Sequence, residues 1–152
     1  MNNAKTIEVD GKHYNIGIWD TFGDSNQDRL RPLNYVATDM FFICFSLISH
    51  SSYESAKERW LEEVRLHQKY VAITLIGTKL DLRDDPETCE KLYERNSCPI
   101  STELGISLSK KIGAVNYFEC SSFSGLNFDI FEKTVQYIEQ RDYEYRKKCI
   151  LF

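Results

Sequence analysis

Two alternating segments flank Asp10-Gly11 near the beginning of the chain. In residues 5–9 and 12–20 apolar and polar side chains alternate, a period of two that predicts half-buried strands. Asp-Gly between such segments predicts a tight turn, because glycine readily takes the positive φ that hairpin turns require. We therefore expect an antiparallel hairpin at this point.

Apolar runs without alternation predict three further strands, covered on both faces. They span residues 39–49, 71–82 and 115–122. Helices are predicted over residues 51–68, 102–114 and 126–148. The first would bury Tyr53, Ala56, Trp60 and Val64, with Ser51 or Ser52 as its N-cap. The last would bury Leu126, Ile130, Phe131, Val135 and Ile138.

The order of these elements predicts the fold class. Strands that alternate with helices indicate a layered α/β fold with a mostly parallel sheet. Residues 84–103 interrupt the pattern; they are highly charged, with Pro86 near a helix start and Pro99 at a break, and we expect an exposed insertion. Polar loops follow the strands at residues 20–23, 78–81 and 120–125, the carboxyl ends where open α/β sheets bind ligands.

Composition and charge narrow the class of protein. With 42% apolar and 28% charged residues, the 152-residue chain has the composition and length of one folded domain. A net charge of −4 argues against nucleic-acid binding, which needs a basic face. Five cysteines in no C-x-x-C pair predict neither a disulfide framework nor a zinc site. The first residues resemble no signal peptide, so we expect a cytoplasmic protein.

Thr78-Lys79-Leu80-Asp81 is the loop with the most specific chemistry. A carboxylate in a strand-exit loop can accept hydrogen bonds from N1–H and the 2-amino group of guanine, while the methylene stem of Lys79 lies against the ring. Adenine offers no such pair of donors. The alternative is a Lys-Asp pair on a solvated loop; the buried strand before the motif and the order of the other loops favour the guanine interpretation.

Several segments together resemble the Rho/Rac family of small GTPases, a branch of the Ras superfamily. They are "VDGKHYNIGIWDTFG", "DRLRPLNY", "FFICFSLIS", "RWLEEVR", "LIGTKLDLRDD" and "GAVNYFECSS". The resemblance runs from residue 5 to the C-terminus, and the charged segment 84–103 is similar to the insertion of Rho proteins. It implies the P-loop-NTPase-like small GTPase fold, a mixed, mostly parallel sheet with flanking helices. Effectors and regulators of Rho type would be the partners.

The resemblance also implies roles for individual residues. Thr78, Lys79 and Asp81 would contact guanine, and Ser121 with the backbone of Ser122 would support the base; the family usually has alanine at the latter position. The phosphate and metal loop would comprise Asp20, Thr21 and Gly23. In it, Asp20 matches the acid that holds Mg²⁺ through water, and Gly23 the glycine whose amide senses the terminal phosphate. GTP or GDP and Mg²⁺ are the implied ligands.

Two departures from the family pattern bear on activity. No G-x-x-x-x-G-K-[ST] motif occurs in the sequence, so the chain resembles a small GTPase that lacks its first strand, phosphate loop, first helix and first switch. The water-orienting glutamine of the family is replaced by Asp24, and Phe22 stands two residues before it. Asp24 would either repel a phosphate or lie solvated in the loop, and both alternatives predict weak or absent GTP hydrolysis.

The C-terminus carries a lipidation signal. Cys149-Ile150-Leu151-Phe152 is a C-a-a-X sequence, and its terminal phenylalanine favours geranylgeranylation of Cys149. Arg146, Lys147 and Lys148 precede the cysteine, and a lipid with a basic patch would hold the protein on an anionic cytoplasmic leaflet. We expect a GTPase-like domain at 1–145, incomplete at its N-terminus, and a prenylation tail at 146–152. The plasma membrane is the expected location.

Two functions remain open on the sequence. The first is a membrane-tethered, Rho-like guanine-nucleotide switch with impaired hydrolysis. The second is a non-catalytic relative that binds effectors through residues 28–35 and the insertion without dependence on nucleotide. A different nucleotide enzyme is disfavoured, because no base, nucleophile or metal cluster is apparent outside these loops.

Overall fold

The computed structural model describes residues 2–21, 23–24, 26, 28–126 and 129–149. Its contacts group the chain into two compact units. We call Met1–Ala37 with Asp129–Phe152 the hairpin unit, and Thr38–Phe128 the sheet unit. Each unit is described by itself.

The hairpin unit begins with the predicted antiparallel hairpin. Strand β1 (Asn2–Val9) pairs with β2 (Lys12–Trp19), and Val9 lies opposite Lys12. Asp10 and Gly11 both have positive φ, 50° and 76°, as the tightest hairpin turns require. Burial alternates along β2 as the sequence pattern predicted. The hairpin prediction is confirmed.

Helix α5 (Ile130–Cys149) completes the hairpin unit together with the short 3-10 helix η2 (Arg31–Tyr35). Ile130 and Val135 are buried on α5, in agreement with the predicted inward face. The prediction for Leu126 is wrong: it precedes the helix, and 50% of its surface is exposed. Its backbone instead bridges to Ser121 in the sheet unit, so an apolar residue just before a helix was misread as part of its buried face.

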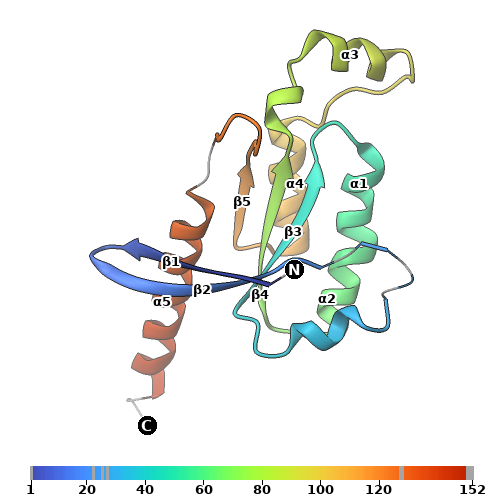
Figure 1. Cartoon of the computed structure of the whole chain (residues 1–152). Helices are drawn as coiled ribbons and strands as arrows, with labels where there is room; N and C mark the ends of the chain where they lie inside the picture. Colours follow the sequence, from blue (N-terminus) through green and yellow to red (C-terminus); the bar gives the residue numbers. More distant parts are fainter. Residues whose placement is uncertain (1, 22, 25, 27, 127–128, 150–152) are drawn as a thin grey trace. The chain divides into compact units, whose positions relative to one another are not determined.

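Three parallel strands form the centre of the sheet unit (Figure 1). Strand β4 (Ala72–Thr78) lies between β3 (Met40–Ser46) and β5 (Asn116–Glu119). The described strands therefore make two sheets, and β2 is not a hydrogen-bonded neighbour of β3. The α/β class with a parallel sheet and flanking helices is confirmed.

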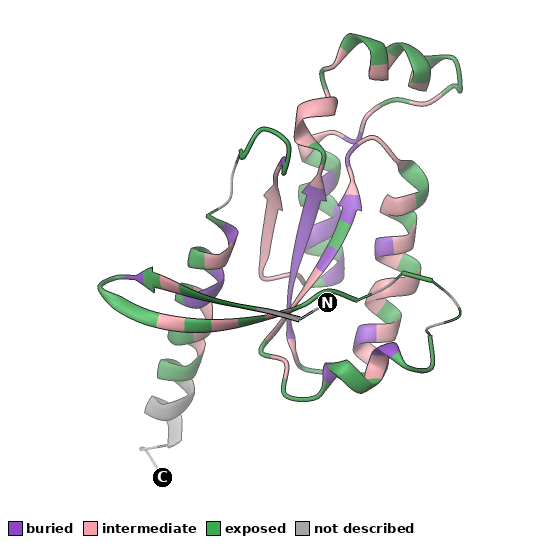
Figure 2. Ribbon diagram, viewed as in Figure 1, coloured by how far each residue is buried: buried purple, intermediate pink, exposed green. Residues whose placement is uncertain are grey.

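Burial is greatest on the middle strand. Ala72 through Gly77 are all buried, as the apolar run without alternation predicted (Figure 2). On β3, Ile43 and Phe45 are buried, and the Phe45 ring packs against Tyr53 and Tyr117. All four residues of β5 are only half-buried, so its predicted coverage on both faces holds in part.

The predicted helix at 51–68 forms three consecutive helical segments. They are α1 (His50–Ser55), a π-helical turn η3 (Ala56–Trp60) and α2 (Leu61–His67). Ala56 and Val64 are buried, and Tyr53 and Trp60 are half-buried. The predicted N-cap is wrong: Ser49, not Ser51 or Ser52, accepts from the Ser52 amide. The apolar run continues to residue 49, which hid the true start of the helix.

The charged segment forms a short helix, and α4 follows it. Asp85 caps α3 (Pro86–Tyr93), whose first residue is the predicted proline. Ser101 caps α4 (Thr102–Ile112), which ends at Gly113 with a φ of 67°. None of the residues of α3 is buried, in line with an exposed insertion. In Figure 1, α3 lies beyond the carboxyl ends of the parallel strands.

Candidate functional site

The loop after β4 turns sharply enough to present Lys79 and Asp81. Lys79 has a φ of 62°, a left-handed conformation that is uncommon outside glycine, asparagine and aspartate. The chain then forms a short 3-10 turn, Leu80–Leu82, in which the Leu82 amide donates to the Lys79 carbonyl at 3.0 Å. The Thr78 hydroxyl donates to the Phe45 carbonyl at 2.9 Å, so it joins the end of β4 to β3.

The loop after β5 meets the loop after β4 directly. Its first residue, Cys120, donates to the Gly77 carbonyl at 2.8 Å and accepts from the Leu80 amide at 3.1 Å. The Ser121 hydroxyl, which is fully buried, donates to Asp81 Oδ1 at 2.5 Å. Residues 40 positions apart are thereby joined at one edge of the sheet. The sequence pattern predicted that these two loops would meet.

Ser121 also organises its own loop. Its Oγ accepts from the Ser124 amide at 3.1 Å, and its amide donates to the Leu126 carbonyl at 3.3 Å. Ser122 is exposed beside it. Ser121 is thus a structural support for Asp81, and the predicted role of the Ser122 backbone stays a prediction.

The geometry at Asp81 suits a base with two adjacent donors. Within the described part of the chain, one carboxylate oxygen takes the Ser121 proton and no hydrogen bond reaches the other. A carboxylate oxygen has lone pairs for more than one donor, so both oxygens can still accept from a ligand. Lys79 is exposed next to it, with its stem available to cover a ring. The residues fit guanine.

An ion pair behind these loops was not predicted from the sequence. Arg83 Nη1 donates to Glu119 Oε2 at 2.7 Å, and the Glu119 side chain is only 10% exposed. Arg83 follows a loop and Glu119 ends a strand, and two isolated charged residues of this kind form no recognisable sequence motif. The only available signal was their spacing, two residues after Asp81 and two before Ser121.

The predicted phosphate and metal loop lies in the hairpin unit. Asp20, Thr21 and Gly23 are exposed after the end of β2, and Phe22 falls outside the described residues. Asp24 Oδ1 accepts from the Asn26 amide at 3.0 Å, and Oδ2 accepts from its Nδ2 at 3.3 Å. The carboxylate at the family's water-orienting position is therefore bound within its own loop.

Arg31 holds that loop together from its other end. Its guanidinium donates to the Asp24 carbonyl at 2.9 Å and to Asp28 Oδ1 at 2.6 Å. Only 3% of the Arg31 side chain is exposed, against 46% for Asp28. A buried cation therefore joins the Asp24 carbonyl to the Asp28 carboxylate.

The described residues contain no group of three or more His, Cys, Asp or Glu side chains placed to hold a metal ion. Asp20 alone would be a minor ligand, which is compatible with Mg²⁺ only where phosphates and water supply most of the oxygens. The residues themselves do not make a magnesium site.

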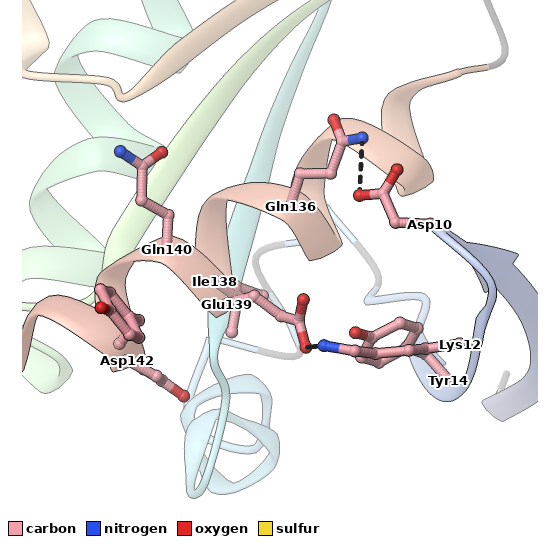
Figure 3. A pocket seen from close by; sticks show the side chains of 9 residues that line it. Asp10, Lys12, Tyr14, Gln136, Ile138, Glu139, Gln140 and Asp142 are labelled. Atoms are coloured by element: carbon pink, nitrogen blue, oxygen red, sulfur yellow. Dashed lines mark hydrogen bonds and ion pairs between the residues drawn. The ribbon is translucent and has the colours of Figure 1, made fainter. Parts of the chain in front are cut away.

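A surface hollow of about 660 Å³ lies between the hairpin turn and α5, within the hairpin unit (Figure 3). Lys12 Nζ lies 3.3 Å from Glu139 Oε1 across it, and Gln136 Nε2 lies 3.5 Å from Asp10 Oδ2. The nearby Tyr14 hydroxyl, followed by Lys12, lowers the pKa of Glu139. These contacts fasten the hairpin to the helix, and no sequence pattern had indicated them.

The lipidation signal lies at the end of α5. Cys149 is the last residue of that helix, and residues 150–152 fall outside the described part of the chain. None of the described helices is long and apolar enough to cross a bilayer. The predicted geranylgeranylation of Cys149 stays a prediction.

Comparison with known families gives a match over most of the chain. The model of the Ras family matches residues 1–140. The matched span includes β1 to β5, the loops after β4 and β5, and half of α5.

Proposed function

The chain belongs to the Ras family of small GTPases, and on that premise we propose that its sheet unit selects guanine nucleotides through Asp81, Lys79 and the Ser121 loop. The observation that carries this proposal is the 2.5 Å hydrogen bond from Ser121 to Asp81. It fixes the orientation of the carboxylate before a ligand arrives, so less conformational freedom is lost on binding.

The proposed contacts account for base selectivity. N1–H and the 2-amino group of guanine would donate to the Asp81 carboxylate, and the Lys79 stem would cover the ring. A hydrogen bond to a charged group contributes roughly 1.5–3 kcal/mol, and an unsatisfied buried acid costs a similar amount. Adenine lacks both donors at these positions and would be rejected by the same carboxylate.

We further propose the Rho type of switch, with effectors and regulators of that type as partners. The exposed insertion supports it: α3 is capped by Asp85 and projects beyond the carboxyl ends of the strands. The segment 28–36 supports a docking role as well, because Leu33 is 71% exposed and Val36 is 77% exposed. Apolar side chains presented in this way are typical of protein contacts.

The proposal includes weak or absent GTP hydrolysis by this chain. Asp24 carries a negative charge where glutamine would orient the attacking water, and its oxygens are occupied by Asn26. A negative charge and occupied oxygens both make Asp24 unsuited to orient a water molecule toward an anionic phosphate. The 152 residues also contain no phosphate-loop motif, so its lysine and amides do not contribute to binding in this chain.

A non-catalytic interaction module is the second candidate. Asp24 favours it, because a loop acid bound to Asn26 has a structural role that needs no nucleotide. In that case the exposed residues Leu33 and Val36 would bind a partner equally well with or without GTP. The two candidates differ in whether guanine binds at all.

For the membrane end of the chain we propose a geranylgeranyl anchor at Cys149 and residence on the cytoplasmic face of the plasma membrane. The C-a-a-X sequence and the three preceding basic residues support this, since one lipid chain and a basic patch together give stable attachment.

The proposed function is tested by the nucleotide preference of the purified chain. We expect GDP to displace a fluorescent guanine nucleotide from the chain and ADP to leave it bound. We also expect the purified protein to contain no GDP, because its binding to the phosphates is weak. Equal displacement by both nucleotides, or no binding of either, would favour the interaction module. Stoichiometric co-purified GDP would show that phosphate binding is strong, and would contradict the proposed weak binding of the phosphates.

A further inference from the structure

Glu119 is the centre of a polar cluster behind the proposed base site. Its Oε2 accepts from Arg83 Nη1 at 2.7 Å and from the Thr102 hydroxyl at 3.0 Å, and its Oε1 accepts from the Tyr117 hydroxyl at 2.8 Å. Arg83 Nη1 also lies 3.0 Å from Thr102 Oγ1. One nearly buried carboxylate therefore receives three donors from three separate elements.

The cluster lies at the base of both loops of the guanine site. Arg83 follows Asp81 by two residues, and Glu119 precedes Ser121 by two. Between these pairs, the Leu80 amide donates to the Cys120 carbonyl at 3.1 Å. A displacement of Glu119 relative to Arg83 would therefore move the Ser121 hydroxyl relative to Asp81.

The same carboxylate holds the two ends of the charged insertion. Arg83 directly precedes the predicted insertion, residues 84–103, and Thr102 lies near its end, so most of the segment runs between two residues that bond to Glu119. The Cys89 thiol donates to the Arg83 carbonyl at 3.3 Å, which joins α3 to the same point. In Figure 1 the insertion, the start of α4 and the end of β4 lie at one end of the sheet.

Tyr117 completes the cluster because Gly105 of α4 has no side chain to occupy the position of the tyrosine ring. A Cβ at position 105 would overlap the Tyr117 hydroxyl, so only glycine allows the ring to lie there. Burial, and after it the Glu119 carboxylate, raises the pKa of Tyr117, so its hydroxyl stays a donor even well above physiological pH.

We propose that Glu119, paired with Arg83 and bonded to Thr102 and Tyr117, is a positioning residue that sets the distance between Asp81 and the Ser121 loop and thereby the guanine selectivity. The inference rests on the proposed guanine site. We expect this ion pair, in which both carboxylate oxygens are bonded, to contribute more to geometry than to net stability, because desolvation offsets much of the attraction of a buried pair. Position, rather than stability, is thus the property on which the test depends.

The test compares Glu119→Gln with wild type in two measurements. The first is amide hydrogen exchange of the nucleotide-free chain at Leu80, whose amide joins the two loops, and at Ser124, whose amide donates to Ser121 Oγ. The second is the affinity ratio for GDP over IDP, since hypoxanthine lacks the 2-amino group that Asp81 would accept. Glu87→Gln is the matched control, because Glu87 forms an exposed ion pair with Lys91 on α3.

We expect Glu119→Gln to speed exchange of both amides about tenfold or more, the effect of losing a charged hydrogen bond, and to lower the GDP to IDP ratio by a similar factor. Glu87→Gln should change neither. Thr102→Val, which removes one donor at nearly constant volume, is the milder variant if Glu119→Gln fails to fold; it should give the same changes at smaller size.

A lower unfolding midpoint with unchanged loop exchange and an unchanged GDP to IDP ratio would overturn the proposal, because that is the result of a merely structural role. Faster exchange confined to residues 84–101 would also overturn it. If wild type shows no preference for GDP over IDP while both loop amides respond to Glu119→Gln, the proposed function fails and the positioning role stands.

Discussion

At the scale of single residues, Asp81 shows what a motif can and cannot predict. Thr78, Lys79 and Asp81 were proposed from the sequence because the loop follows a buried strand and can pair a carboxylate with a lysine stem. The order of the loops predicted that the loops after β4 and β5 would meet, but the hydrogen bond from Ser121 to Asp81 was not predicted. Glu119 was not predicted, because its importance comes from three donors that converge only in space.

Asp24 is the residue that bears most directly on the proposed weak hydrolysis. Replacing it in Asp24→Gln removes a charge that would oppose a phosphate oxygen, an interaction of up to roughly 4 kcal/mol at 4 Å and an effective dielectric of 20. Since Asn26 already occupies the carboxylate, we expect a smaller gain, about tenfold in single-turnover phosphate release at saturating GTP.

The control for Asp24→Gln is Asn26→Ala, which removes the Nδ2 donor to Asp24 Oδ2 but keeps the backbone amide donor and the charge of Asp24. It should leave hydrolysis as slow as in wild type or slower. Equal turnover in wild type and Asp24→Gln would count against the charge as a cause of weak hydrolysis.

At the scale of elements, the sequence located the three strands of the sheet unit, the helical residues 50–67 and α4, but missed details of their ends. It gave no helix bounds for α3 and included the 3-10 turn Leu80–Leu82 in a strand. Periodicity predicts the middle of a helix, whereas its first residue depends on a single capping hydrogen bond. Ser49 accepts that bond, but it lies in the apolar segment 39–49 that the sequence pattern assigns to a strand. The π-helical turn at Ala56–Trp60 was not predictable, because one extra residue per turn leaves the apolar spacing nearly unchanged.

The observed cap of α1 gives a stability prediction. Ser49→Ala removes the oxygen that accepts from the Ser52 amide at 3.3 Å, and such a loss costs about 1 kcal/mol in the free energy of unfolding. Ser51→Ala, at the position that the sequence pattern favoured, should cost less than about 0.5 kcal/mol. Urea denaturation followed by tryptophan fluorescence measures both, and the reverse order would mean that the helix begins later.

Helix α3 should depend on pH through its cap. The Thr88 hydroxyl, followed by the Thr88 amide, donates to Asp85 and lowers its pKa. Because the folded pKa is the lower one, the cap stabilises α3 above the ordinary aspartate pKa of about 3.9 and loses this effect as the pH falls through the lowered value. Carbon chemical shifts of residues 86–93 should show the helix fraying over that range.

Asp85→Asn separates the titration of the cap from a general effect of acid. Its α3 shifts should change little over the same pH range, because asparagine caps a helix without titrating. Parallel curves for wild type and Asp85→Asn would show that another group controls the helix.

At the scale of the whole molecule, the Ras family match spans the sheet unit and most of the hairpin unit, and the predicted site residues divide between the two units. The loops after β4 and β5 belong to the sheet unit, and Asp20, Asp24 and Cys149 belong to the hairpin unit. Sequence order predicted the parallel sheet correctly. It placed β2 in that sheet as well, because alternation reports that a strand is half-buried and does not identify its partner.

The proposed membrane anchor is a property of the whole chain. Cys149→Ser should abolish incorporation of a labelled geranylgeranyl group and sedimentation of the prenylated chain with vesicles that contain anionic lipid. Replacing Arg146, Lys147 and Lys148 by glutamine should keep the label and weaken vesicle binding, by about 1 kcal/mol for each charge. Label that persists in Cys149→Ser would place the modification elsewhere.

The most direct test of guanine recognition by Asp81 is a change of base preference. In Asp81→Asn an amide donor replaces one carboxylate oxygen, which suits the 2-oxo group of xanthine and opposes the 2-amino group of guanine. Competition binding with GDP, XDP and ADP should therefore show GDP preferred by wild type and XDP preferred by Asp81→Asn. The same order of affinities in both proteins would contradict the account.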